Sequence, residues 1–133
     1  MRRLHLPLAV CAIALGAFAW YYTGPARPWV RGHVGDVAAA ILVYAALGLV
    51  WRGRPLARAV LAFSFAAALE VGQSLWQVSS LAGELTLGDT FDPIDFAAYA
   101  AGVAIGLGYE RSTRYLLSQS IVRRHARSAP ASS

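Results

Sequence analysis

Four long stretches of the chain are almost wholly apolar, and short polar segments separate them. They cover residues 4–23, 35–51, 56–76 and 91–109. A helix needs about 17 to 25 mainly apolar residues to cross the hydrocarbon core of a bilayer, and each stretch has such a length. No stretch alternates apolar and polar residues over the length that a membrane-spanning strand requires. We therefore predict an all-α protein, a four-helix transmembrane bundle formed by residues 1–110.

The positions of the arginine residues predict how the four spans are oriented. Loops rich in positive charge near the ends of spans stay on the cytoplasmic side of a membrane. All the arginines except Arg27 and Arg31 lie before the first span, between the second and the third or at the start of the third, or after the fourth. We therefore expect both the N-terminus and the C-terminus to be cytoplasmic.

The N-terminal segment has a second interpretation, as a cleavable secretory signal peptide. Arg2 and Arg3 precede an apolar run that reaches an Ala-Phe-Ala motif at residues 17–19, which is typical of a cleavage site. Cleavage there would leave three spans and place the new N-terminus outside. The run continues past this motif to the aromatic residues 20–22, which favours a retained span.

Two contacts beyond the bundle itself are expected from the last third of the chain. Residues 111–133 form a basic tail with interleaved apolar residues, which predicts an amphipathic helix lying on anionic lipid of the inner leaflet. Residues 128–133 have nothing to bury, so we expect them to be disordered. Gly102 and Gly106 form a GxxxG pattern that lets another helix approach closely, including one from a second copy of the chain.

The composition agrees with lipid as the solvent, because 57% of the residues are hydrophobic and 14% are charged. The formal net charge of +5 would suit a nucleic-acid-binding protein, but the arginines are clustered at the ends of spans. We therefore expect membrane lipids as partners and no nucleic acid. The single cysteine, Cys11, lies in an apolar run, which excludes an intrachain disulfide and a cysteine-based zinc site. No cofactor is predicted.

Several polar side chains lie within the predicted spans or at their outer ends, where a simple membrane anchor does not need them. A carboxylate deep in hydrocarbon costs at least about 2.5–3.5 kcal/mol, so such a residue indicates a functional site. The predicted topology brings the carboxylates together in the outer half of the bilayer, below the first outer loop. The candidate binding residues are Asp36, Tyr44, Glu70, Gln73, Asp92, Asp95 and Tyr99, with Arg27 and Arg31 in that loop.

Most of these residues also have a simpler interpretation. Asp36 and Asp92 are of a type favoured at helix N-termini, where they would act as caps. Tyr44 and Tyr99 are expected to hydrogen-bond carboxylates rather than to act as catalytic acids. Glu70 differs from them, because a carboxyl group in mid-span caps nothing and must be protonated, paired or bound to a cation.

Three segments carry a family resemblance: GDVAAAILVY at residues 35–44, EVGQ at 70–73 and LGDTFDPIDFAAYAAG at 87–102. They resemble the signatures of DUF2809, an uncharacterised bacterial membrane family that is similar to the VanZ-like proteins linked to teicoplanin resistance. The resemblance covers residues 35–108 and implies a four-span protein of the bacterial inner membrane with no assigned activity. Tyr99 departs from the VanZ-like pattern, which has asparagine there.

The leading functional hypothesis is an outward-facing acidic pocket that binds a cation or the headgroup of an envelope lipid. Asp36, Glu70 and Asp95 would bind, and Gln73 and Tyr99 would orient them. The alternatives are a VanZ-like glycopeptide-resistance protein or envelope-lipid enzyme with a carboxylate base, a structural subunit, and a small ion or proton carrier. The sequence has no nucleophile elbow, metal-binding histidine motif or phosphate-binding loop to support catalysis.

Overall fold

The computed structural model describes residues 2–79 and 93–128, and all the elements in these two ranges are helical. A short 3-10 turn, η1 (Arg2–Leu4), leads into α1 (His5–Tyr21). The next helical stretch consists of α2 (Arg27–Trp29), the π-helical segment η2 (Val30–Val34) and α3 (Gly35–Val50). Helices α4 (Pro55–Ser79) and α5 (Pro93–Ser128) follow. The predicted all-α fold is confirmed for the described residues.

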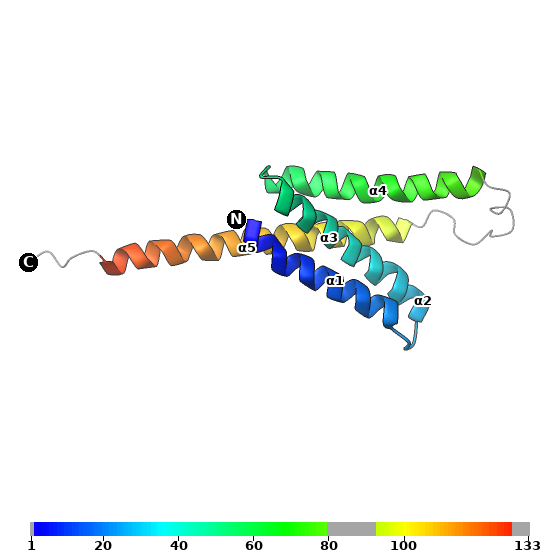
Figure 1. Cartoon of the computed structure of the whole chain (residues 1–133), viewed down its shortest axis with the longest axis horizontal. Helices are drawn as coiled ribbons and strands as arrows, with labels where there is room; N and C mark the ends of the chain where they lie inside the picture. Colours follow the sequence, from blue (N-terminus) through cyan, green and yellow to red (C-terminus); the bar gives the residue numbers. More distant parts are fainter. Residues whose placement is uncertain (1, 80–92, 129–133) are drawn as a thin grey trace, which may run out of the picture.

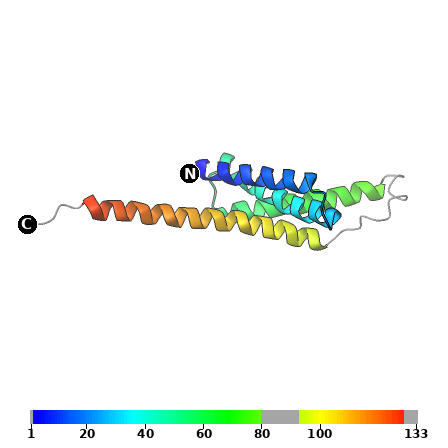
Figure 2. The ribbon, with the colours of Figure 1, turned by 90° about the horizontal axis from the view of Figure 1, so that it is seen from below.

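Helix α3 packs against α1, α4 and α5 and so forms the centre of the bundle (Figure 1). The N-terminus and the connection between α3 and α4 lie at one end of the bundle, where α5 leaves it and continues toward the C-terminus (Figures 1 and 2). We call this the basic end, because Arg52, Arg54 and Arg58 lie there. The opposite end, which we call the acidic end, carries Asp36 and Asp95.

The second helical stretch begins earlier than the sequence predicted. It starts at Arg27 rather than at residue 35, and Val34 before α3 is itself in helical conformation. Pro28 is compatible with this start, because the missing N–H of a proline in the first helical turn has no intrahelical partner to lose. Arg27 and Arg31 therefore lie on a helix and not in a loop. Asp36 does not cap α3, since the helical chain continues through it without a side-chain cap.

Helix α5 also differs from the prediction, which placed a boundary between a span and a separate tail at residue 110. It runs for 36 residues without interruption, because no glycine or proline follows Gly108 before its end at Ser128. The basic tail is thus a direct continuation of the helix in the bundle (Figure 2). The expected disorder falls mainly on residues 129–133, which lie outside the described residues.

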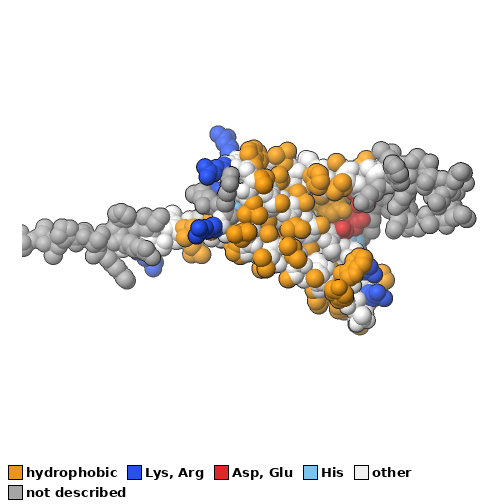
Figure 3. Space-filling view, viewed as in Figure 1, with side chains coloured by type: hydrophobic (Ala, Val, Ile, Leu, Met, Phe, Trp, Pro, Cys, Tyr) orange, Lys and Arg blue, Asp and Glu red, His pale blue; other side chains and the backbone are white. Residues whose placement is uncertain are grey.

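Small side chains fill the interior of the bundle and large apolar ones cover its outside. Ala40, Ala45 and Ala62 are completely buried, whereas Val10 is 64% exposed and Tyr21 is 79% exposed. Apolar side chains accordingly dominate the visible face of the bundle, and acidic ones show at the end opposite the N-terminus (Figure 3). Two helical stretches, Arg27–Val50 and Pro55–Gly72, are long and apolar enough to cross a membrane, and His5–Tyr21 is a shorter apolar helix.

Gly102 and Gly106 allow α5 to lie close against α3. A Cβ atom on Gly102 would come within 2.6 Å of the Val37 carbonyl oxygen and 2.8 Å of the Ala40 Cβ. A Cβ atom on Gly106 would come within 2.7 Å of the Tyr44 ring. Both glycines are buried by this contact within the chain, and the expected contact with a second copy stays a prediction.

Candidate functional site

An acidic centre forms where η2, α3 and α5 meet at the acidic end. His33, Asp36 and Asp95 each offer one ligand atom, and these atoms all lie within 4.8 Å of one another. His33 Nδ1 is 3.1 Å from Asp95 Oδ1, and both side chains are largely buried. His33 and Asp36 share a face because they are three residues apart on a continuous helical stretch. Asp95 lies two turns before Gly102 on α5, so the close packing at that glycine brings it toward α3.

Glu70 and Tyr99 extend the acidic centre toward α4. The Tyr99 hydroxyl donates a hydrogen bond of 3.1 Å to Glu70 Oε2, and Tyr99 lies one turn after Asp95 on the same face of α5. The centre therefore gathers three carboxyl groups and one imidazole from three helical stretches.

This arrangement has the chemistry of a cation site. Three carboxyl groups that face one another cannot all remain ionised unless protons or a cation offset their charge. One imidazole nitrogen with two carboxylates is a donor set that divalent transition metals accept readily, and oxygen donors alone are the set preferred by Ca²⁺ and Mg²⁺. The candidate binding residues predicted from the sequence include Asp36, Glu70 and Asp95 but not His33.

The other residues predicted near this site have different positions. Arg31 stacks its guanidinium on the Trp20 ring, 3.8 Å from the ring centre, and Arg27 is exposed. Asp92 and the side chain of Gln73 lie outside the described residues. The structure therefore describes only the part of the predicted pocket that lies on η2, α3, α4 and α5.

A second polar centre, which the sequence analysis did not predict, lies at the basic end around the buried carboxylate of Glu110. Its Oε2 accepts hydrogen bonds from the Tyr44 hydroxyl at 2.6 Å and from Arg58 Nη1 at 2.5 Å. Its Oε1 accepts one from Arg114 Nη2 at 2.5 Å. Glu110 is 0% exposed and Arg58 is 2% exposed, so this is a buried ion pair. Tyr44, predicted to belong to the acidic pocket, thus points to the opposite end.

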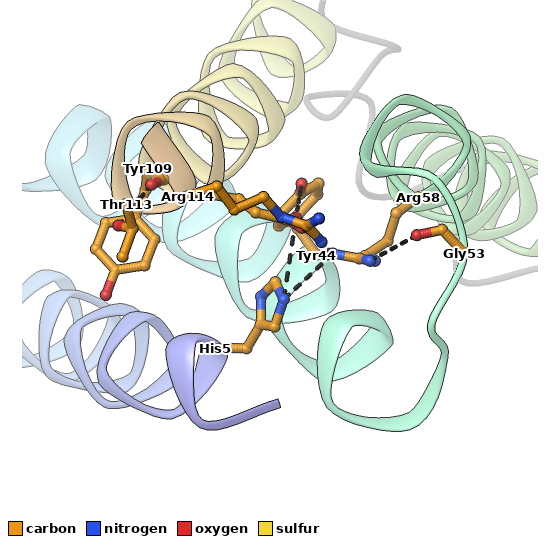
Figure 4. Close-up of polar contacts among 8 residues, drawn as sticks. His5, Tyr44, Gly53, Arg58, Tyr109, Thr113 and Arg114 are labelled. Carbon is orange, nitrogen blue, oxygen red and sulfur yellow. Dashed lines mark hydrogen bonds and ion pairs between the residues drawn. The ribbon is translucent and has the colours of Figure 1, made fainter. Parts of the chain in front are cut away.

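His5 completes this centre from α1 (Figure 4). Its Nε2 lies 3.2 Å from Arg58 Nη1, and arginine can only donate, so His5 accepts through Nε2 and carries its proton on Nδ1. Arg58 Nη2 donates to the Gly53 carbonyl at 3.0 Å. The ring of His5 packs directly on Gly48, where any side chain would collide with it. Polar contacts therefore tie α1, α3, α4 and α5 together at this end.

The surroundings of Glu110 keep its carboxyl group ionised. Burial alone would raise the pKa of Glu110, but the hydrogen bonds from Tyr44 and Arg114 and the charge of Arg58 outweigh burial and lower it. One signal in the sequence could have revealed this centre. Arg58 falls inside the predicted third span, where an arginine needs a partner, and Glu110 is the only carboxylate side chain of the described residues at that end.

The residues of the acidic centre lie within the part of the chain that matches a known sequence family. The family model described as a protein of unknown function, DUF2809, matches residues 26–103, more than half of the chain. The matched range contains His33, Asp36, Glu70, Asp95 and Tyr99, whereas Glu110 lies beyond it. No curated protein and no solved structure matches the chain.

Proposed function

The chain belongs to the DUF2809 family of proteins of unknown function, and we propose that it is a four-span inner-membrane protein that binds a divalent cation at its acidic centre. The cation would enter from the outer side of the membrane. The membrane assignment and the cation site rest on separate observations.

The distribution of side-chain sizes supports the membrane assignment. In a soluble bundle the large apolar residues fill the core, whereas here most of the buried apolar residues are alanines and residues such as Val10 and Tyr21 face outward. Small residues between helices and large apolar residues outside are the arrangement expected of a bundle in lipid. Helix α1 and the first half of α5 would complete the four spans. The arginine-rich end is then cytoplasmic, which places the acidic centre in the outer half of the bilayer.

The proximity of His33, Asp36 and Asp95 is the observation that carries the cation site. Their ligand atoms lie within 4.8 Å of one another although His33 and Asp95 are 62 residues apart in sequence. A group of partly buried acidic side chains is costly in lipid unless charge is offset, and a divalent cation offsets two charges at once. Tyr99 holds Glu70 beside this group, where its carboxylate adds negative charge.

A thermal stability measurement tests the cation site. The full chain is purified in detergent, treated with a chelator and titrated with Zn²⁺, Mn²⁺, Mg²⁺ or Ca²⁺. We expect at least one of these ions to raise Tm, since a ligand at 100 times its Kd stabilises the folded state by about 2.7 kcal/mol. Asp95→Asn and His33→Gln should each reduce this gain.

Two control variants make the outcome specific. Tyr115→Phe removes an exposed hydroxyl on the part of α5 that lies far from the acidic end, so it should keep the response to the cation. His125→Gln removes a histidine near the end of α5 and should behave like the wild type. If no divalent ion raises Tm, or if Asp95→Asn responds like the wild type, the proposal is wrong.

A further inference from the structure

A cavity of about 580 Å³ opens at the basic end, opposite the acidic centre. It lies among the start of α1, the end of α3, the connection to α4 and the middle of α5. Four arginines line it together with His5 and Trp51: Arg52, Arg54, Arg58 and Arg114. Arg58 and Arg114, which line the cavity, are the two arginines that donate hydrogen bonds to Glu110.

The charges around this cavity are not balanced. Glu110 supplies one negative charge, and it accepts hydrogen bonds from Arg58 and Arg114. Arg52 and Arg54 are exposed at the rim and form no ion pair with another described residue. An anion in the cavity would thus meet a net excess of positive charge, and two of the arginines, Arg58 and Arg114, are already held in place by Glu110.

Buried nitrogen atoms in the cavity wall also lack partners. His5 Nδ1, Arg58 Nε and Arg114 Nε are shielded from solvent and make no hydrogen bond to another described residue. His5 is 3% exposed and Arg58 is 2% exposed, so bulk water does not hydrogen-bond to the donors of these two residues. A buried donor without an acceptor is unfavourable, which is why an acceptor-rich ligand would be favoured here.

We propose that this cavity binds a phosphate group, carried either by an anionic lipid of the cytoplasmic leaflet or by a soluble compound. Arginine is the side chain best suited to phosphate, because its planar donors match the phosphate oxygens in pairs. Trp51 is 40% exposed beside the cavity, and tryptophan is enriched at the depth of lipid headgroups. Basic pockets between spans on the cytoplasmic side are a common form of headgroup site.

The test uses rim arginines, which can be changed without disturbing the Glu110 centre. The full chain in detergent, with chelator present throughout, is titrated with phosphatidylglycerol or with phosphatidylcholine. A parallel titration compares inorganic phosphate with chloride at equal ionic strength. The variant Arg52→Gln/Arg54→Gln is compared with Arg3→Gln/Arg111→Gln, which removes two exposed arginines that do not line the cavity. Arg54→Gln alone serves if the first double variant does not fold.

We expect phosphatidylglycerol or inorganic phosphate to raise Tm in the wild type and in Arg3→Gln/Arg111→Gln. Arg52→Gln/Arg54→Gln should need about tenfold more of the same probe, or more, for half of the effect. A response to phosphatidylglycerol alone would identify a lipid headgroup, and a response to inorganic phosphate alone would identify a soluble compound. No response to either probe, or an equal loss in both double variants, would overturn the proposal.

Discussion

Arg58 Nη1 and Glu110 Oε2 lie 2.5 Å apart although 52 residues separate them in sequence, and both side chains are buried. The pair joins α4 to α5 at the basic end of the bundle. Because neither group reaches solvent, each depends on the other to offset its charge.

Removing one member of this pair should destabilise the protein strongly. Glu110→Gln leaves the guanidinium of Arg58 buried without a counter-charge, so we expect a loss of about 3–5 kcal/mol in the free energy of unfolding. Reversible unfolding in mixed micelles measures this loss. Arg111→Gln changes the exposed neighbour and should be close to neutral. A loss in Glu110→Gln no larger than in Arg111→Gln would mean that the pair contributes little.

The same carboxylate predicts a pH dependence of stability. The pKa of Glu110 is held below its ordinary value of 4.5 in the folded protein, so the unfolded chain takes up the proton first as the pH falls. The stabilisation by Glu110 is complete above the unfolded pKa and is lost as the pH falls through the folded pKa. The stability difference between wild type and Glu110→Gln should therefore shrink in acid. A constant difference across the pH range would show that Glu110 does not titrate in this way.

The close packing of α3 and α5 predicts opposite effects for two glycine substitutions. Gly102→Ala would place a Cβ atom 2.6 Å from the Val37 carbonyl oxygen, and we expect a loss of about 1–3 kcal/mol as the helices move apart. Gly108→Ala meets nothing within 4 Å and should stabilise the helix by up to about 1 kcal/mol. Unfolding measured in the same detergent compares the two. Equal effects would argue against tight packing at Gly102.

Cation binding at the acidic centre should be linked to proton release. Ligand atoms of Asp36 and Asp95 lie within 4.8 Å of each other, so protons offset part of their charge when no cation is present, and a cation bound to both carboxylates displaces those protons. We expect the apparent affinity for the effective divalent ion to rise with pH, and Asp36→Asn to weaken the binding. Calorimetric titration in two buffers of different ionisation enthalpy counts the released protons. Binding without proton release would mean that the cation does not take both carboxylates.

Reporter fusions test the proposed topology. Fusions near Gly53 and after Ser133 should report the cytoplasm, and a fusion near residue 83 should report the exterior. These outcomes follow from four retained spans with the arginine-rich end inside. An exterior location for the fusion after Ser133 would contradict them.

The helices were largely predictable from the sequence, and their exact limits were not. Length and apolar composition marked all four helical stretches, because these properties are local. The start at Arg27 was missed, since Gly24, Pro25 and Pro28 look like a break even though a proline is tolerated in a first helical turn. The length of α5 was missed because the prediction ended the span at the change from apolar to basic residues. Such a change affects which solvent surrounds the helix and does not end its backbone conformation.

The two polar centres were predictable to different degrees. Asp36 and Asp95 were grouped because both lie near the same ends of their helices, and the structure places them together. Tyr44 shares a helix face with Asp36 but lies two turns, about 12 Å, further along α3, so it reaches Glu110 instead. Arg58 was assigned a role in topology alone, and its pairing with Glu110 depends on which helices are neighbours, which sequence spacing does not reveal.

Helices α3 and α5 touch through polar contacts at both of their shared ends, with Gly102 and Gly106 between them. Asp95 and Glu110 on α5 are roughly 22 Å apart at 1.5 Å per residue, and each meets a partner on the same helical stretch, His33 or Tyr44. A shift of α5 along α3 by one turn, about 5.4 Å, would break both contacts together. The two helices are therefore held in a single register, and any opening of the acidic end has to come from tilting or bending rather than from sliding.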